Sequence, residues 1–153
     1  LARTKKSQER IEEMKARTRE QRERVQCENI MLEARSKLEK VDAAFQQVAA
    51  AEVPYLKGLD FLPVDDANKA VADSEAAGAA VEQAVKEVRT FLAAKTLEVK
   101  SLLEVVAKAG LEQIETLVKK IEESKEKLVQ FTKETEGRKR VAQTQTAVAK
   151  VSE

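Results

Sequence analysis

The residue types that usually perform catalysis are scarce in this sequence. It contains no histidine and one cysteine, Cys27. Without histidine, no side chain has an ordinary pKa near 7, which removes Ser-His-Asp triads and the Glu-x-x-His metal sites of helical bundles. A single cysteine cannot form an intramolecular disulfide or a multi-cysteine zinc site. Because no histidine can act as its base, we interpret Cys27 as a packed or simply exposed thiol.

The residues that could hold a metal ion or a phosphate group are spaced unfavourably. The pairs Glu12-Glu13 and Glu122-Glu123 are adjacent in the sequence, so their carboxylates diverge on a helix. The four glycines are far apart and do not form a phosphate-binding loop. We therefore predict that the chain is not an enzyme, with no catalytic residues, no cofactor and no metal site.

Two basic segments could contact an anionic partner. Residues 1–24 contain nine Lys/Arg and five Glu, and Arg138-Lys139-Arg140 form a second group. The whole chain is balanced, with 28 basic and 27 acidic residues, which is typical of a solvated surface with ion pairs. No aromatic residue precedes Phe45, and glutamates interrupt the basic residues, unlike in most membrane-surface helices. We expect no specific nucleic-acid partner.

The segment 52–64, Glu-Val-Pro-Tyr-Leu-Lys-Gly-Leu-Asp-Phe-Leu-Pro-Val, is unusually apolar for a loop. Its candidate protein-contact residues are Tyr55, Leu56, Leu59 and Phe61. One interpretation is that they fold back and plug the end of a helical bundle, because leaving them in water is unfavourable. The other is that they form an exposed docking patch, in which the two prolines limit the loss of entropy on binding. The sequence leaves both interpretations open.

The composition indicates which elements hold these residues. Charged residues make up 36%, apolar residues 42% and aromatic residues 3% of the chain, as in coiled coils and long helices. Few aromatics imply a thin core. No apolar run is long enough to span a membrane, and no signal peptide is evident. The single cysteine favours a reducing, intracellular compartment. The first residue is Leu1, which is consistent with a fragment or a processed product.

Apolar residues recur at helical spacing and predict helices over 3–51, 66–108 and 111–150, with Gly110 ending the second. These three helices should match in length, apart from an overhang of residues 1–10. The fold class is therefore an all-α, elongated, antiparallel three-helix bundle or coiled coil. Residues 1–24 should form a charged helical arm that is continuous with the first helix and either projects from the bundle or rests only loosely on it. Residues 25–153 should form the bundle, with 52–64 as its apolar loop.

The expected core follows from the same apolar stripes. The small residues of 76–80 should let a neighbouring helix approach closely. The side chains predicted to be buried are Leu38, Phe45, Val85, Leu92, Leu102, Leu117 or Val118, Ile121 and Leu128.

The stretches 51–58, Ala-Glu-Val-Pro-Tyr-Leu-Lys-Gly, then Leu62-Pro63, then 89–100, Arg-Thr-Phe-Leu-Ala-Ala-Lys-Thr-Leu-Glu-Val-Lys, carry a resemblance. Over roughly residues 40–140 the chain resembles a helical repeat of large predicted proteins of dinoflagellate algae, whose function is unknown. The resemblance implies a helical unit of a longer, repeat-bearing protein and no catalytic residues. The three-helix layout also resembles a spectrin-type repeat, although the tryptophan usual in those repeats is missing.

Two classes of function compete. The first is a structural or scaffolding helical module that binds protein partners of unknown identity. The second is a peripheral bundle that binds lipid or a polyanion through the basic residues of 1–24. An accessory subunit of a large complex, a hydrophilic helical protein of the stress type and self-association also remain open. The interleaved glutamates of residues 1–24 favour the scaffold.

Overall fold

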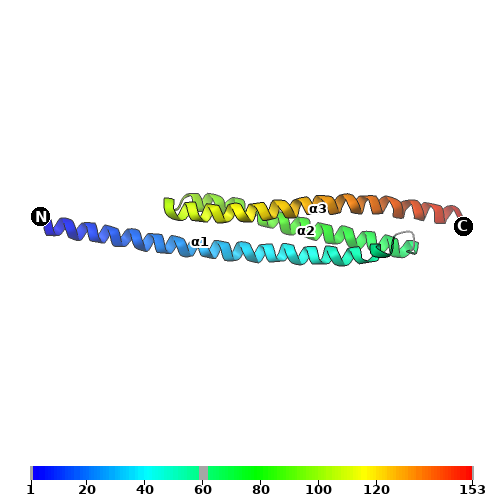
Figure 1. Ribbon diagram of the computed structural model, residues 1–153, viewed down its shortest axis with the longest axis horizontal. Coiled ribbons are helices and arrows are strands. Elements are labelled where there is room, and N and C mark those ends of the chain that lie inside the picture. The colour runs from blue at the N-terminus through cyan, green and yellow to red at the C-terminus, as the bar shows by residue number, and fades with distance from the viewer. Residues whose placement is uncertain (1, 59–61, 153) are drawn as a thin grey trace.

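Three long helices make up almost all of the computed structural model, which describes residues 2–58 and 62–152. They are α1 (Ala2–Glu52), α2 (Val64–Lys100) and α3 (Glu104–Ser152), and a short 3-10 helix, η1 (Val53–Lys57), follows α1. No strand occurs within the described ranges. α2 packs against both α1 and α3, and the chain reverses direction at each connection (Figure 1). The prediction of an all-α, antiparallel three-helix bundle is confirmed.

The first connection is built from residues that restrict the backbone. Pro54 lies in the first turn of η1, where its missing N–H is not needed. Gly58 closes η1 with a φ of 82°, a left-handed value that favours glycine, and its N–H donates to the carbonyl of Tyr55 at 3.0 Å. α2 begins directly after Pro63, with Asp65 and Asp66 in its first turn, where negative charge is favourable.

The second connection does not lie at Gly110, where the sequence predicted the end of the second helix. α2 ends at Lys100 and α3 begins at Glu104, so the predicted boundaries at 108 and 111 are wrong. The N–H groups of Ser101 and Leu102 bond to the last carbonyls of α2 and close the turn. The helices are consequently unequal, with 51, 37 and 49 residues in α1, α2 and α3, and the prediction of matched lengths is also wrong.

Gly110 lies inside α3, at a point where three helices approach one another. A Cβ atom added there would lie 2.9 Å from Val99 Cγ1 on α2 and 3.3 Å from Cys27 Sγ on α1. Real Cβ atoms do not approach a methyl group at 2.9 Å without a shift of one of them. The glycine therefore permits close packing and does not end a helix.

Most of the residues predicted for the core are buried, but some are only half-buried. Val85, Leu92, Leu117, Ile121 and Leu128 are buried, which resolves the choice between positions 117 and 118. The prediction of full burial is wrong for three side chains, which are half-buried against this core and expose one edge because three helices enclose only a narrow interior. These are Leu38, Phe45 and Leu102.

Small residues do let α2 and α3 approach closely, as predicted. A Cβ atom on Gly78 would lie 3.2 Å from Phe131 Cε1 of α3. Ala77 and Val81 are buried on the same part of α2. The ring of Phe131 thus occupies the space that a larger residue at position 78 would need.

The start of α1 extends beyond the turn between α2 and α3 (Figure 1). Every side chain of residues 2–19 is exposed, including Ile11 and Met14 at 50% and 64%. The first buried side chain of α1 is Glu23, followed by Cys27. We call residues 2–19 the projecting arm, which is about 27 Å long at 1.5 Å per residue.

Candidate functional site

The four candidate contact residues of the loop have different surroundings. Tyr55 is half-buried, whereas Leu56 is 84% exposed. Leu59 and Phe61 lie outside the described residues. The structure therefore separates Tyr55, which contacts the bundle, from Leu56, which faces solvent, and the choice between a plug and a docking patch stays a prediction.

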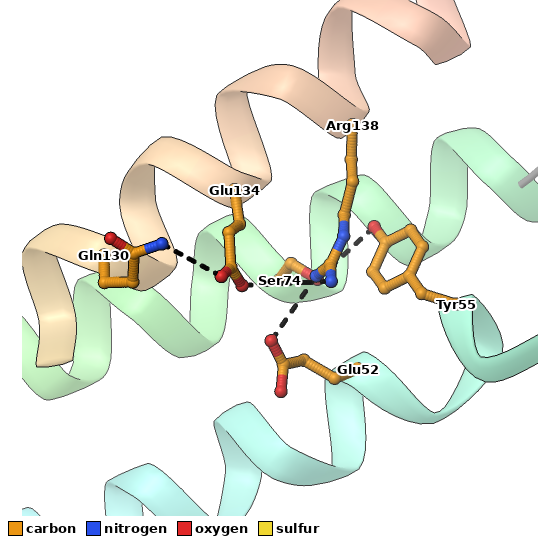
Figure 2. Close-up of polar contacts among 6 residues, drawn as sticks. All are labelled: Glu52, Tyr55, Ser74, Gln130, Glu134 and Arg138. Carbon is orange, nitrogen blue, oxygen red and sulfur yellow. Dashed lines mark hydrogen bonds and ion pairs between the residues drawn. The ribbon is translucent and has the colours of Figure 1, made fainter. Parts of the chain in front are cut away.

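A group of polar side chains surrounds Tyr55 and joins the elements at this end of the bundle (Figure 2). The guanidinium of Arg138 lies 4.1 Å from the centre of the Tyr55 ring, a cation–π geometry. The same guanidinium is 3.4 Å from Glu52 Oε1 and 3.9 Å from Glu134 Oε2. The Ser74 hydroxyl donates to Tyr55 Oη at 3.4 Å. α1, η1, α2 and α3 each contribute to this cluster, which suits structural closure.

Two residues of the basic triplet 138–140 form ion pairs with other helices of the bundle. Arg138 is turned into the cluster around Tyr55, with about a quarter of its side chain exposed. Lys139 pairs with Glu75 of α2 at 2.9 Å. Two of the three cations therefore bridge helices of this bundle.

At the opposite end, α1 holds the turn between α2 and α3. Glu23 Oε2 accepts a hydrogen bond from the Leu103 N–H at 2.8 Å, and Glu23 Oε1 accepts one from Arg19 at 3.0 Å. The carbonyl of Leu103 accepts the first hydrogen bond of α3, from Ala107. Leu103 has no side-chain oxygen that could accept from the first N–H groups of α3, but its own N–H is bonded by Glu23 from another helix. The Leu103 hydrogen bond, with help from Arg19, holds the pKa of Glu23 below its usual value against the effect of burial.

Cys27 lies one turn further along α1 and is buried. Burial raises the pKa of its thiol, and the nearby charges of Glu23 and Glu98 raise it further. A thiol with a raised pKa is a weaker nucleophile at neutral pH because less thiolate is present. The surroundings of Cys27 therefore favour a packing role.

Glu98 links α1 to α2 beside this cysteine. It accepts hydrogen bonds from Lys95 at 2.8 Å and from Gln26 of α1 at 2.7 Å. These two bonds lower the pKa of Glu98, and the bond with Glu98 raises the pKa of Lys95. The charges are thus paired with one another and not with an open site.

A groove runs between α2 and α3, with a volume of about 880 Å³. We call it the α2–α3 groove. Its floor contains Val85 and Leu128, which are buried, and Val129, which is 46% exposed. The lining residues on each helix are spaced three or four positions apart, so they lie along one face of that helix. Its outer edges are charged, with Glu82, Lys86 and Arg89 on α2 and Lys125, Lys133 and Glu136 on α3.

The adjacent carboxylate pairs do not assemble into a metal site. Glu12 and Glu13 are exposed on the projecting arm, and Glu122 forms an ion pair with Arg89 at 3.7 Å. Within residues 2–58 and 62–152, no group of three or more Cys, Asp or Glu side chains is placed to hold a metal ion. Among these same residues, no helix has the length and apolar character needed to cross a membrane.

Comparison of the chain with protein-family models, with curated proteins and with solved structures finds no match. The described residues form a three-helix all-α bundle.

The sequence interpretation did not identify the α2–α3 groove. The charges that line it were visible, because Lys86 and Arg89 are three residues apart on α2, and Lys125 and Lys133 are eight apart on α3. Such spacings place each pair on one face of its helix. What the sequence did not provide was the register that brings the two faces together.

Proposed function

We propose that this chain is a non-catalytic structural module, a helical unit of a longer repeat-bearing protein that binds protein partners. The observation that carries the proposal is the projecting arm, residues 2–19, in which every side chain is exposed. Most helices in proteins are stabilised by packing an amphipathic face. The arm has no such packing within its own bundle, so a helix outside this bundle is its natural counterpart.

The position of the arm supports a role between successive units. α1 continues past the turn that joins α2 to α3 (Figure 1). In tandem helical repeats each unit contacts its neighbours, and a helix that extends past its own unit can supply that contact. The resemblance to repeat-bearing dinoflagellate proteins is consistent with this role, and the lack of histidine supports a function without catalysis.

A second candidate is binding to anionic lipid or a polyanion. It is favoured by the charge of the arm, which contains seven Lys/Arg and three Glu, all exposed. The glutamates interrupt the basic surface, and only Ile11 and Met14 offer bulky apolar contact. Membrane-surface helices usually separate the two kinds of residue more fully. We therefore place protein binding first.

The proposal is tested by capture of partners from native extract on the immobilised full chain, identified by mass spectrometry. The test variant is Ile11→Ser/Met14→Ser in the projecting arm. The matched control is Val25→Ser/Leu32→Ser, which removes two side chains that are 54% and 62% exposed on the same helix. Because all four side chains are exposed, neither variant should change the melting temperature.

We expect the arm variant to lose a defined set of captured proteins that the control retains. Equal capture by both variants, or no protein enriched over an empty matrix, contradicts the proposal. Cosedimentation with vesicles of phosphatidylserine provides the comparison with the second candidate. Loss of vesicle binding in a variant with Arg3, Lys5 and Lys6 changed to Glu, without any captured protein, would favour lipid binding.

A further inference from the structure

The α2–α3 groove has the dimensions of a helix-binding site. Its α2 wall extends from Glu82 to Ala93, twelve residues, which is about 18 Å or three helical turns. Its floor is apolar, with Val85 and Leu128 buried and Val129 half-exposed. Two antiparallel helices form its walls, and no residue of α1 lines it. An apolar groove between two helices can receive the apolar face of another helix.

The charges along the groove select the chemistry of an occupant. Arg89 is partly compensated by Glu122 at 3.7 Å, but Lys86, Lys125 and Lys133 form no ion pair with any described residue. The excess of positive charge at the groove contrasts with residues 25–153, which contain 19 basic and 22 acidic residues. The groove is thus a cationic strip on an acidic body. Its edges present four cations and two carboxylates, namely Lys86, Arg89, Lys125 and Lys133 against Glu82 and Glu136.

Two surfaces of a second copy of this chain are poor occupants because of their charge. The arm of a second copy would bring nine basic and five acidic residues over 1–24, an excess of the same sign as the groove. The α2–α3 groove of a second copy would bring the same cationic excess. Like charges placed opposite one another across an interface oppose binding. Charge complementarity therefore favours an acidic helix over either of these two surfaces.

We propose that the α2–α3 groove binds an acidic amphipathic helix of a partner protein, about three turns long. The apolar stripe of this helix lies on Val85, Leu128 and Val129, and its carboxylates lie beside Lys86, Lys125 and Lys133. The proposal rests on the proposed protein-binding function and adds the site and the charge of the partner.

The experiment uses the full chain and a synthetic peptide of about 18 residues, longer than the groove by two turns. The acidic probe has leucines at alternating spacings of three and four residues, with glutamates on both sides of the stripe. A basic probe replaces these glutamates by lysine, and a scrambled probe keeps the composition but removes the stripe. Binding is measured by fluorescence anisotropy at low and at physiological salt.

Two charge-reversed variants provide the matched comparison. Lys86→Glu/Lys133→Glu changes two exposed edge residues of the groove. Lys120→Glu/Lys127→Glu makes the same change in net charge at exposed positions of α3 that do not line the groove. All four lysines are exposed, so both variants should fold, which circular dichroism will verify.

We expect the acidic probe to bind the native chain and the groove variant to bind it on the order of tenfold more weakly, as expected for the reversal of two edge charges. The Lys120/Lys127 variant should bind within about twofold of the native chain. Val129→Ser should also weaken binding without changing the melting temperature, whereas Leu97→Ser, which removes an exposed side chain outside the groove, should not.

Several results would overturn the proposal. These are no binding of the acidic probe, equal binding of the basic or scrambled probe, or equal loss in both charge-reversed variants. Competition by phosphatidylserine vesicles that depends on Lys86 and Lys133 would assign the groove to a lipid surface instead. If the probe fails while arm-dependent capture persists, only the groove assignment falls. If the probe binds but no protein is captured through the arm, the proposed function loses its support.

Discussion

Gly110 and Gly137 allow the packing of α3 to be tested with one substitution at two places. Both glycines lie inside α3. A Cβ atom on Gly110 would lie 2.9 Å from Val99 Cγ1, whereas nothing lies within 4 Å of a Cβ atom on Gly137. Replacing either glycine by alanine removes the same penalty for glycine within a helix, about 1 kcal/mol. The difference between the two variants therefore isolates the steric term.

Gly137→Ala is expected to stabilise the chain by about 1 kcal/mol. For Gly110→Ala the same gain is opposed by overpacking, which typically costs about 1–3 kcal/mol. Val99 has no exposed surface and a branched side chain with few rotamers, so its methyl group cannot easily move away. The net effect at position 110 is thus between no change and a loss of about 2 kcal/mol.

Urea unfolding followed by circular dichroism at 222 nm measures the free energy of unfolding of both variants. In thermal unfolding, each kcal/mol of this free energy should shift the melting temperature by about 2–4 °C in a chain of this size. Val99→Ala removes the opposing methyl groups, so Gly110→Ala in that background should recover its stabilisation. The expected coupling energy of this double-mutant cycle is about 0.5–3 kcal/mol. Equal stabilisation by alanine at 110 and 137, or strict additivity in the cycle, would refute the close approach of α3 to Val99.

Three further changes probe other contacts of the bundle. Leu92→Ala should cost about 2–5 kcal/mol in thermal or urea unfolding, because Leu92 is 2% exposed, and an unchanged melt would remove it from the core. Glu23→Gln should destabilise the chain at pH 7 and have a smaller effect at pH 3. The pKa of Glu23 is lowered in the folded chain, so its contribution is complete above its unfolded value of 4.5 and disappears as the pH falls through the folded value. An effect of equal size at both pH values would contradict a role for its charge. Thr135→Val should leave stability unchanged or raise it by about 1 kcal/mol, because the buried Thr135 Oγ1 finds no hydrogen-bond partner among the described residues, and a clear loss in urea unfolding would indicate that the hydroxyl is bonded.

The fold class followed from apolar periodicity, but the second connection did not. Pro54 and Pro63 mark the first connection correctly, because proline limits the backbone wherever it occurs. A glycine in a helical sequence can either end the helix or let a neighbouring helix approach closely. Gly110 has the second role. The turn at 101–103 contains no glycine or proline, and its Leu103 N–H is bonded by Glu23 from another helix. A local sequence pattern cannot reveal a hydrogen-bond partner that comes from eighty residues away.

The shift of the second connection from the predicted 109–110 to 101–103 also explains why the α2–α3 groove was not predicted. A turn at 109–110 would place Gln130 opposite Arg89, whereas the observed ion pair joins Arg89 to Glu122. The difference is about eight residues, or two helical turns, along α3. Apolar residues recur every three to four positions along α3, so a shift of about two turns again places apolar residues opposite α2, and the clearest change is in the partners of the charged edges. Apolar periodicity therefore determined which faces meet, and the position of the turn determined which charges share a groove.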